Sequence, residues 1–107
     1  MTFGERLREL RQDNDETQEQ IGKILNIGAR MISHYEKNEH FPRDAKSIIL
    51  LAEHFNVTTD YLFGVSNIKN YNKIKELFSD YSNLSEENRK EVYDFTKYML
   101  YKEKNKK

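Results

Sequence analysis

Histidine side chains are the groups in this 107-residue chain that could bind a metal ion or transfer a proton near neutral pH. The three histidines, His34, His40 and His54, have no glutamate or cysteine partner at a metal-binding spacing such as HExxH or CxxC. The chain has no cysteine, which excludes disulfides and thiolate chemistry. Its four glycines are isolated, so it has no phosphate-binding glycine loop. We therefore expect no enzyme activity, no metal site and no cofactor.

The most organised stretch is residues 17–35, whose pattern predicts two short helices joined by a tight turn. Thr17 and Gln20 have the spacing of a capping box, which begins the first of these helices. Asn26 tolerates the left-handed backbone of a turn, and Gly28 is acceptable as the N-cap of the second helix. The apolar residues at helical spacing are Ile21, Ile24, Leu25, Ile32 and Tyr35. The second helix leaves these residues outside: Ala29, Arg30, Met31, Ser33 and His34.

This pattern resembles the helix-turn-helix of the Cro and phage-repressor family of bacterial DNA-binding domains. The resemblance covers residues 1–65. The matches occur in order at Thr17-Gln18, Ile32, Tyr35-Glu36, Pro42, Leu51-Ala52 and residues 56–64. Glu16, Gly22 and Gly28 depart from the family pattern, in which a leucine, an alanine and a hydroxyl side chain are usual at these positions.

In that family the second helix of the motif lies in the DNA major groove, and its N-terminal residues contact base edges. The resemblance therefore implies that the bases are read by Ala29, Arg30, Ser33 and His34. Arg30 is the foremost of these, because its guanidinium can donate two hydrogen bonds to guanine O6 and N7. A phosphate contact is the alternative for Arg30. Contacts to phosphates or thymine methyls are expected from Gln18, Met31, Lys37, Asn38 and Arg43.

The charge of the chain sets a condition on DNA binding. The net charge is zero, and residues 1–66 carry 8 basic against 11 acidic side chains. Residues 67–107 carry 10 basic against 7 acidic side chains. Because phosphate neutralisation supplies most non-specific affinity, the basic residues of the first part must gather on one surface.

Helical patterns also flank the motif. Thr2 and Glu5 form a second capping box. The buried stripe of this first helix is Phe3, Leu7 and Leu10. Its remaining side chains Arg6, Arg8, Glu9 and Arg11 are expected on a solvated face, with a phosphate contact from one arginine as the alternative. Phe41 is expected to be buried beneath the loop that follows the motif. A helix over residues 45–55 and a short helix around Tyr61 complete an all-α domain of five helices.

The remaining chain is expected to form a linker over residues 66–72 and a two-helix extension over residues 73–107, with a basic, frayed tail from Lys102. Two helices of this size have too little apolar area to fold alone. We expect the longer helix to pair with a second copy of the chain, and folding back onto the first domain is the alternative. The residues assigned to this dimer contact are Val92, Phe95, Thr96, Met99 and Leu100.

No apolar run is long enough to span a membrane, and the first residues do not have the pattern of a signal peptide. We therefore expect a cytoplasmic protein with no membrane contact, and no small-molecule ligand is predicted. The function implied by the resemblance is a transcriptional regulator, a repressor that binds double-stranded DNA as a homodimer at an inverted-repeat operator. The alternative is a helix-turn-helix module that binds another protein, as an antitoxin-like regulator does.

Overall fold

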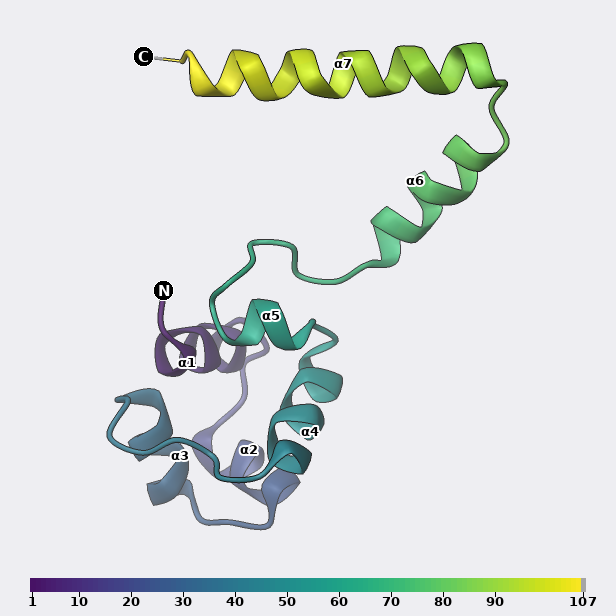
Figure 1. Ribbon diagram of the computed structural model, residues 1–107. Coiled ribbons are helices and arrows are strands. Elements are labelled where there is room, and N and C mark those ends of the chain that lie inside the picture. Colours follow the sequence, from purple (N-terminus) through teal and green to yellow (C-terminus); the bar gives the residue numbers. More distant parts are fainter. Residues whose placement is uncertain (107) are drawn as a thin grey trace. The chain divides into compact units, whose positions relative to one another are not determined.

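The computed structural model describes residues 1–106, and over these residues it contains helices and no strand (Figure 1). The chain divides into two compact units, Met1–Tyr71 and Asn72–Lys107. The first unit contains α1 (Phe3–Asp13), α2 (Gln18–Leu25), α3 (Ala29–Glu36), α4 (Ala45–Phe55) and α5 (Thr59–Leu62). The second unit contains α6 (Asn72–Ser82) and α7 (Glu86–Lys104). The predicted all-α fold, a five-helix domain followed by two further helices, is confirmed.

The core of the first unit is built from apolar side chains of all five of its helices. Its buried members are Phe3, Leu7, Leu10, Ile21, Ile32, Ile48, Leu51, Ala52, Phe55, Val57 and Leu62. The stripes predicted for α1 and α4 are therefore confirmed. Tyr35 packs against this core, as expected from its helical spacing. Each large aliphatic side chain buried here contributes about 1.5–3 kcal/mol.

Local sequence signals begin and end these helices. Both predicted capping boxes form, with Thr2 and Thr17 each accepting a hydrogen bond from the backbone three residues on. The Thr2 backbone and hydroxyl lower the pKa of the Glu5 carboxylate, which accepts the Thr2 N–H at 3.1 Å. Asn26 and Asn38 have the expected left-handed backbone, with φ of 57° and 60°. The turn that follows α2 therefore has the predicted geometry.

The expectation of a solvated arginine face on α1 is wrong for Arg6. Its residue is only 5% exposed, and its guanidinium carbon lies 3.7 Å from the centroid of the Tyr61 ring. Its Nε also donates to the sulfur of Met1 at 3.1 Å. Cation–π contact with α5 therefore replaces hydration for this arginine.

The expectation that Phe41 is buried is also wrong. Phe41 is 51% exposed, and its ring stacks on that of Phe63 with centroids 5.9 Å apart. The rings of Phe41 and Phe3 are in a T-shaped arrangement, with their centroids 4.9 Å apart. Phe41 therefore covers the buried Phe3 from outside, because the loop that carries it lies on the surface of the core.

Gly4 allows a close approach between α1 and the end of α3. A Cβ atom at Gly4 would lie 2.5 Å from the Tyr35 carbonyl oxygen, 2.6 Å from that of Glu36 and 2.7 Å from Asn38 Oδ1. The Gly4 N–H also donates to Asn38 Oδ1 at 3.1 Å. A Gly4→Ala variant is expected to lose about 2 kcal/mol of its free energy of unfolding, because two backbone carbonyls must move apart.

Urea unfolding measures this loss, and Gly28→Ser is the matched control. A Cβ at Gly28 has no neighbour within 4 Å. The added hydroxyl can cap α3, so this variant is expected to be at least as stable as the wild type. Equal stabilities of Gly4→Ala and the wild type would contradict the close contact.

The second unit has amphipathic helices but no buried side chain among its described residues. Ser85 caps α7 by accepting the Asn88 N–H at 3.2 Å, as predicted. The exposed large apolar residues of α6 and α7 are Ile74, Leu77, Phe78, Val92, Tyr93, Phe95, Tyr98, Met99, Leu100 and Tyr101. The tail predicted to be frayed from Lys102 is instead helical to Lys104, and Lys107 lies outside the described residues. No described helix combines the length and apolar character needed to cross a lipid bilayer.

Candidate nucleic-acid interface

The turn between α2 and α3 fixes the direction of the second helix of the motif. The Ile27 N–H donates to the Gly22 carbonyl oxygen at 2.9 Å. A Cβ atom at Gly22 would lie 2.5 Å from the Ile27 carbonyl oxygen, so glycine lets the turn pack directly on α2. Gly28 then takes an ordinary extended conformation as the N-cap of α3, without a side-chain cap. Glycine in place of the family's usual alanine at position 22 therefore fits the close packing of this turn on α2.

The outer side of α3 presents the residues that were predicted to read bases. Arg30 and Met31 are exposed. The next residue, Ile32, is fully buried in the core. The half-buried members of the predicted set are Ala29, Ser33 and His34. One side of α3 is therefore buried in the core, and the other side carries an arginine, a methionine and small side chains.

His34 has neighbours in the loop after α3. Its Nδ1 lies 3.5 Å from the Glu39 carboxylate, and its ring is nearly perpendicular to that of His40, with the two centroids 5.1 Å apart. The 3.5 Å separation is too long for a good hydrogen bond. His34 is thus placed between the exposed side of α3 and an acidic loop residue.

The residues predicted to contact phosphates differ in what their side chains already bind. Lys37 and Arg43 are exposed. Asn38 accepts the Gly4 N–H and donates to the Thr2 hydroxyl at 2.9 Å, so its amide joins α1 to the end of α3. Gln18 is half-buried, and its Nε2 donates to Glu36 Oε1 at 3.2 Å.

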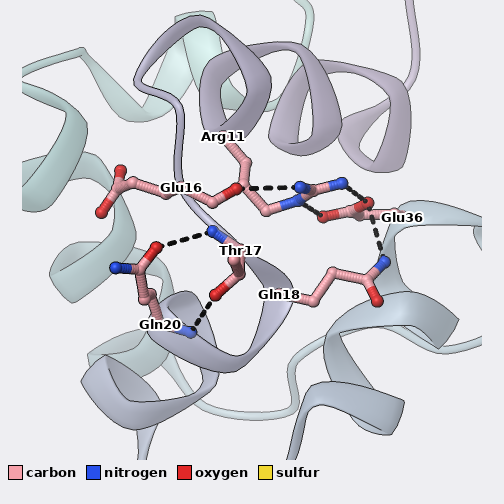
Figure 2. A network of polar contacts seen from close by, with 6 residues as sticks. All are labelled: Arg11, Glu16, Thr17, Gln18, Gln20 and Glu36. Carbon is pink, nitrogen blue, oxygen red and sulfur yellow. Dashed lines mark hydrogen bonds and ion pairs between the residues drawn. The ribbon is translucent and has the colours of Figure 1, made fainter.

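A buried ion pair joins the three helices of this region, as Figure 2 shows. Arg11 Nε donates to Glu36 Oε2 at 2.7 Å, and Arg11 Nη2 donates to Glu36 Oε1 at 3.0 Å. The third nitrogen, Nη1, donates to the Glu16 carbonyl oxygen at 2.9 Å, just before α2 begins. The hydrogen bonds to Glu36 raise the pKa of Arg11. The solvated position expected for Arg11 is therefore wrong, because its guanidinium ties α1 to α3 and to the start of α2.

A contact with His54 gives a structural role to the glutamate that departs from the family pattern at position 16. His54 Nε2 lies 2.8 and 2.9 Å from the two carboxylate oxygens of Glu16. This contact links the segment before α2 to α4. Sequence reasoning missed both pairs, because their partners are 25 and 38 residues apart.

Comparison with known proteins identifies the family. A family model described as a helix-turn-helix domain matches residues 4–68. The HTH-type transcriptional regulator ImmR of Bacillus subtilis (strain 168) is 37% identical over 73 residues, which are 68% of this chain. That alignment spans 57% of the length of ImmR.

Two solved structures are similar to this chain. The P22 c2 repressor, in a crystal with synthetic operator 9T and Tl⁺, has a TM-score of 0.57 and 26% identity, covering 62% of this chain and 98% of the repressor chain. A transcriptional regulator from Listeria innocua has a TM-score of 0.57 and 27% identity, covering 90% of each chain. These relatives are regulators and repressors, a non-enzymatic class. The chain belongs to the helix-turn-helix domain family, of the Cro and phage-repressor type.

Proposed function

We propose that this protein is a sequence-specific DNA-binding transcriptional regulator, a repressor that acts as a homodimer on an inverted-repeat operator. The observation that carries the proposal is the outer side of α3, where the exposed Arg30 stands beyond the tight turn of the motif. The operator in the crystal of the related P22 c2 repressor supports the same ligand class. In this arrangement the dimer would repress by occupying the DNA that polymerase needs.

Base recognition is assigned to the exposed side of α3. Arg30 would donate two parallel hydrogen bonds to guanine, a contact worth about 1–3 kcal/mol of discrimination. Ala29 and Met31 would contact thymine methyl groups, and His34 would reach a base edge or a phosphate. The phosphate contacts are assigned to Gln18, Lys37, Asn38 and Arg43.

Two of the acidic side chains near the helix-turn-helix motif are paired within the protein. Glu36 is neutralised by Arg11, and Glu16 is paired with His54. Glu16 and Glu36 are thus engaged inside the protein, whereas Glu19 of α2 and Glu39 after α3 are exposed. The internal pairing of Glu16 and Glu36 favours DNA as the ligand over the alternative of another protein that binds the same face.

Homodimerisation is assigned to the second unit. Its described residues include none that is buried, although its two helices carry ten large exposed apolar side chains. Short helices are marginal in water without a packing partner. A second copy of α7, contacting Val92, Phe95, Thr96, Met99 and Leu100, would cover this apolar side. Two copies of α3 would then meet two half-sites spaced by about 34 Å or a multiple of it.

An Arg30→Ala variant is expected to weaken binding to the preferred site by about 10–100-fold and to reduce the preference over random DNA. The measurement is a gel shift on the DNA upstream of the protein's own gene, at low and high salt, with random competitor. Arg30→Lys is the matched control for charge, because lysine keeps the cation but loses the two-pronged donor geometry.

If Arg30→Lys keeps the wild-type preference for the specific site, then charge alone is sufficient at this position, and the residue contacts a phosphate. If Arg30→Ala binds the preferred site as tightly as the wild type does, Arg30 does not contact the bases. If the wild-type protein binds every sequence equally and releases it at modest salt, the regulator proposal itself is wrong.

A further inference from the structure

The chain changes direction immediately after α5. Gly64 has a left-handed backbone, with φ of 80°. Its N–H donates to the Tyr61 carbonyl oxygen at 3.0 Å, and the Val65 N–H donates to that of Asp60 at 3.0 Å. These two hydrogen bonds form a Schellman motif, which ends a helix and turns the chain away from the helix axis. The segment that follows passes back over α5 (Figure 1).

This returning segment, residues 65–70, is attached to the N-terminus of α5, and we term it the clasp. The Lys69 carbonyl oxygen accepts the N–H of Thr58 at 2.9 Å, and Thr58 is the N-cap of α5. The Asn70 side-chain amide lies 3.5 Å from the carbonyl oxygen of the α4 C-cap, which is a long contact. The clasp therefore joins both ends of α5 through the backbone of the first unit.

Hydrogen bonds rather than apolar burial hold the clasp. Its two aliphatic side chains, Val65 and Ile68, are 75% and 47% exposed. The Ile68 N–H donates to Ser66 Oγ at 3.0 Å, which makes a local turn inside the clasp. Because no buried side chain anchors this segment, a more flexible sequence in its place is expected to release it without disturbing the core.

The clasp shortens the free chain between the two units. Since α6 begins at Asn72, Tyr71 alone lies between the clasp and that helix. One residue spans at most about 3.6 Å, whereas residues 65–71 would span about 25 Å with the clasp released. A base pair advances about 3.4 Å along DNA. The two tethers of a dimer could thus adjust by about two base pairs when clasped, and by more than a helical turn when released.

We infer that the clasp makes this protein selective for the distance between the two half-sites of its operator. Thr58 and Lys69 are the positioning residues, and they act through their backbone groups. A released tether would let the two copies of α3 reach half-sites at many spacings, but it would lower the effective concentration of the second reading helix. This inference deepens the proposed homodimeric DNA binding and rests on it.

The test compares the full-length wild type with a variant in which residues 66–70 are replaced by alternating glycine and serine. Such a sequence is a flexible coil of the same length. Both proteins are titrated in a gel shift with the DNA upstream of the protein's own gene, and with the same DNA carrying five extra base pairs at its centre of symmetry. The insertion moves one half-site by about 17 Å and to the opposite face of the duplex.

The wild type is expected to bind the lengthened DNA about 10²–10⁴-fold more weakly than the natural DNA, because one half-site is then out of reach. The Gly/Ser variant should lose less than about 10-fold on lengthening, since its longer tethers can follow the second half-site. On the natural DNA this variant should bind about 10–20-fold more weakly than the wild type, because effective concentration falls with tether length. Equal losses on lengthening for the two proteins would overturn the inference.

Asn67→Gly is the matched control, because it adds glycine to the clasp at an exposed side chain that has no hydrogen bond within the described residues. It should keep the spacing selectivity of the wild type. Amide hydrogen exchange followed by NMR examines the clasp without DNA. The Thr58 N–H should exchange at least about 10-fold faster in the Gly/Ser variant than in the wild type or Asn67→Gly. Equal exchange rates in all three proteins would contradict the clasp.

The two measurements separate this inference from the proposed function. If the wild type binds the upstream DNA no better than random DNA, the regulator proposal is wrong and the spacing role is wrong with it. If the wild type binds the natural and the lengthened DNA equally well while the Thr58 amide is protected, the regulator proposal stands and the role of the clasp is wrong.

Discussion

An Arg11→Ala variant is expected to lose about 3–5 kcal/mol of its free energy of unfolding, because the substitution strands a buried charge. The Glu36 side chain, which is 3% exposed, would keep one neutral hydrogen bond from Gln18 and no counter-charge. The segment before α2 would also lose the hydrogen bond to the Glu16 carbonyl oxygen. A small domain has about 5–15 kcal/mol in total, so this loss is a large share of the stability of the first unit. Urea unfolding followed by circular dichroism measures the loss.

Two control variants separate the buried charge from other effects of the substitution. Arg8→Ala removes another arginine of α1, whose side chain makes no hydrogen bond or ion pair within the described residues, and its stability should match the wild type. The double variant Arg11→Met/Glu36→Leu removes both charges and should unfold at higher urea than Arg11→Ala. A loss under about 1 kcal/mol for Arg11→Ala, the range of exposed ion pairs, would contradict the burial of this pair.

The stability supplied by this pair should not change with pH through the neutral range. The hydrogen bonds that Arg11 donates to Glu36 raise the pKa of Arg11 in the folded protein. The contribution of a group with a raised pKa is complete below its ordinary value and falls only as pH rises through the folded value. Arginine remains protonated far above neutral pH, so the difference between Arg11→Ala and the wild type should be constant there.

The elements of the first unit could be predicted because their signals lie within a few residues of one another. Thr17 and Gln20 are three residues apart, and their capping box forms as expected. Asn26 turns the chain because its short polar side chain tolerates a left-handed backbone. Ile32 is fully buried because helical periodicity alone decides which side of α3 faces the core.

The polar contacts could not be predicted, because they join residues that only the folded chain brings together. Arg11 and Arg8 have the same side chain on the same helix, yet Arg11 is paired with Glu36 and Arg8 is exposed. Nothing within α1 distinguishes them, since the difference is set by where α3 ends. Phe41 shows the converse case, because an aromatic residue in a loop can cover a core without entering it.

A Val92→Lys/Met99→Lys variant is expected to weaken the proposed dimer by at least about 1,000-fold in Kd. These residues lie two helical turns apart on one side of α7. In a two-fold dimer the variant removes four apolar side chains from the interface, each worth about 1.5–3 kcal/mol when buried, and adds like charges that face each other. Sedimentation equilibrium of the full chain measures the change.

Tyr101→Lys is the matched control, since residue 101 lies about 200° around the helix from Met99 and also carries a large exposed apolar side chain. It should remain dimeric. The double variant should also bind an inverted repeat about 10²–10⁴-fold more weakly, because a monomer loses the gain from a tethered second half-site. A double variant that sediments as the wild type does would show that α7 is not the contact. If the wild type is monomeric at micromolar concentration, the homodimer proposal is wrong. Contacts of one α3 with one half-site would then have to supply all of the sequence specificity.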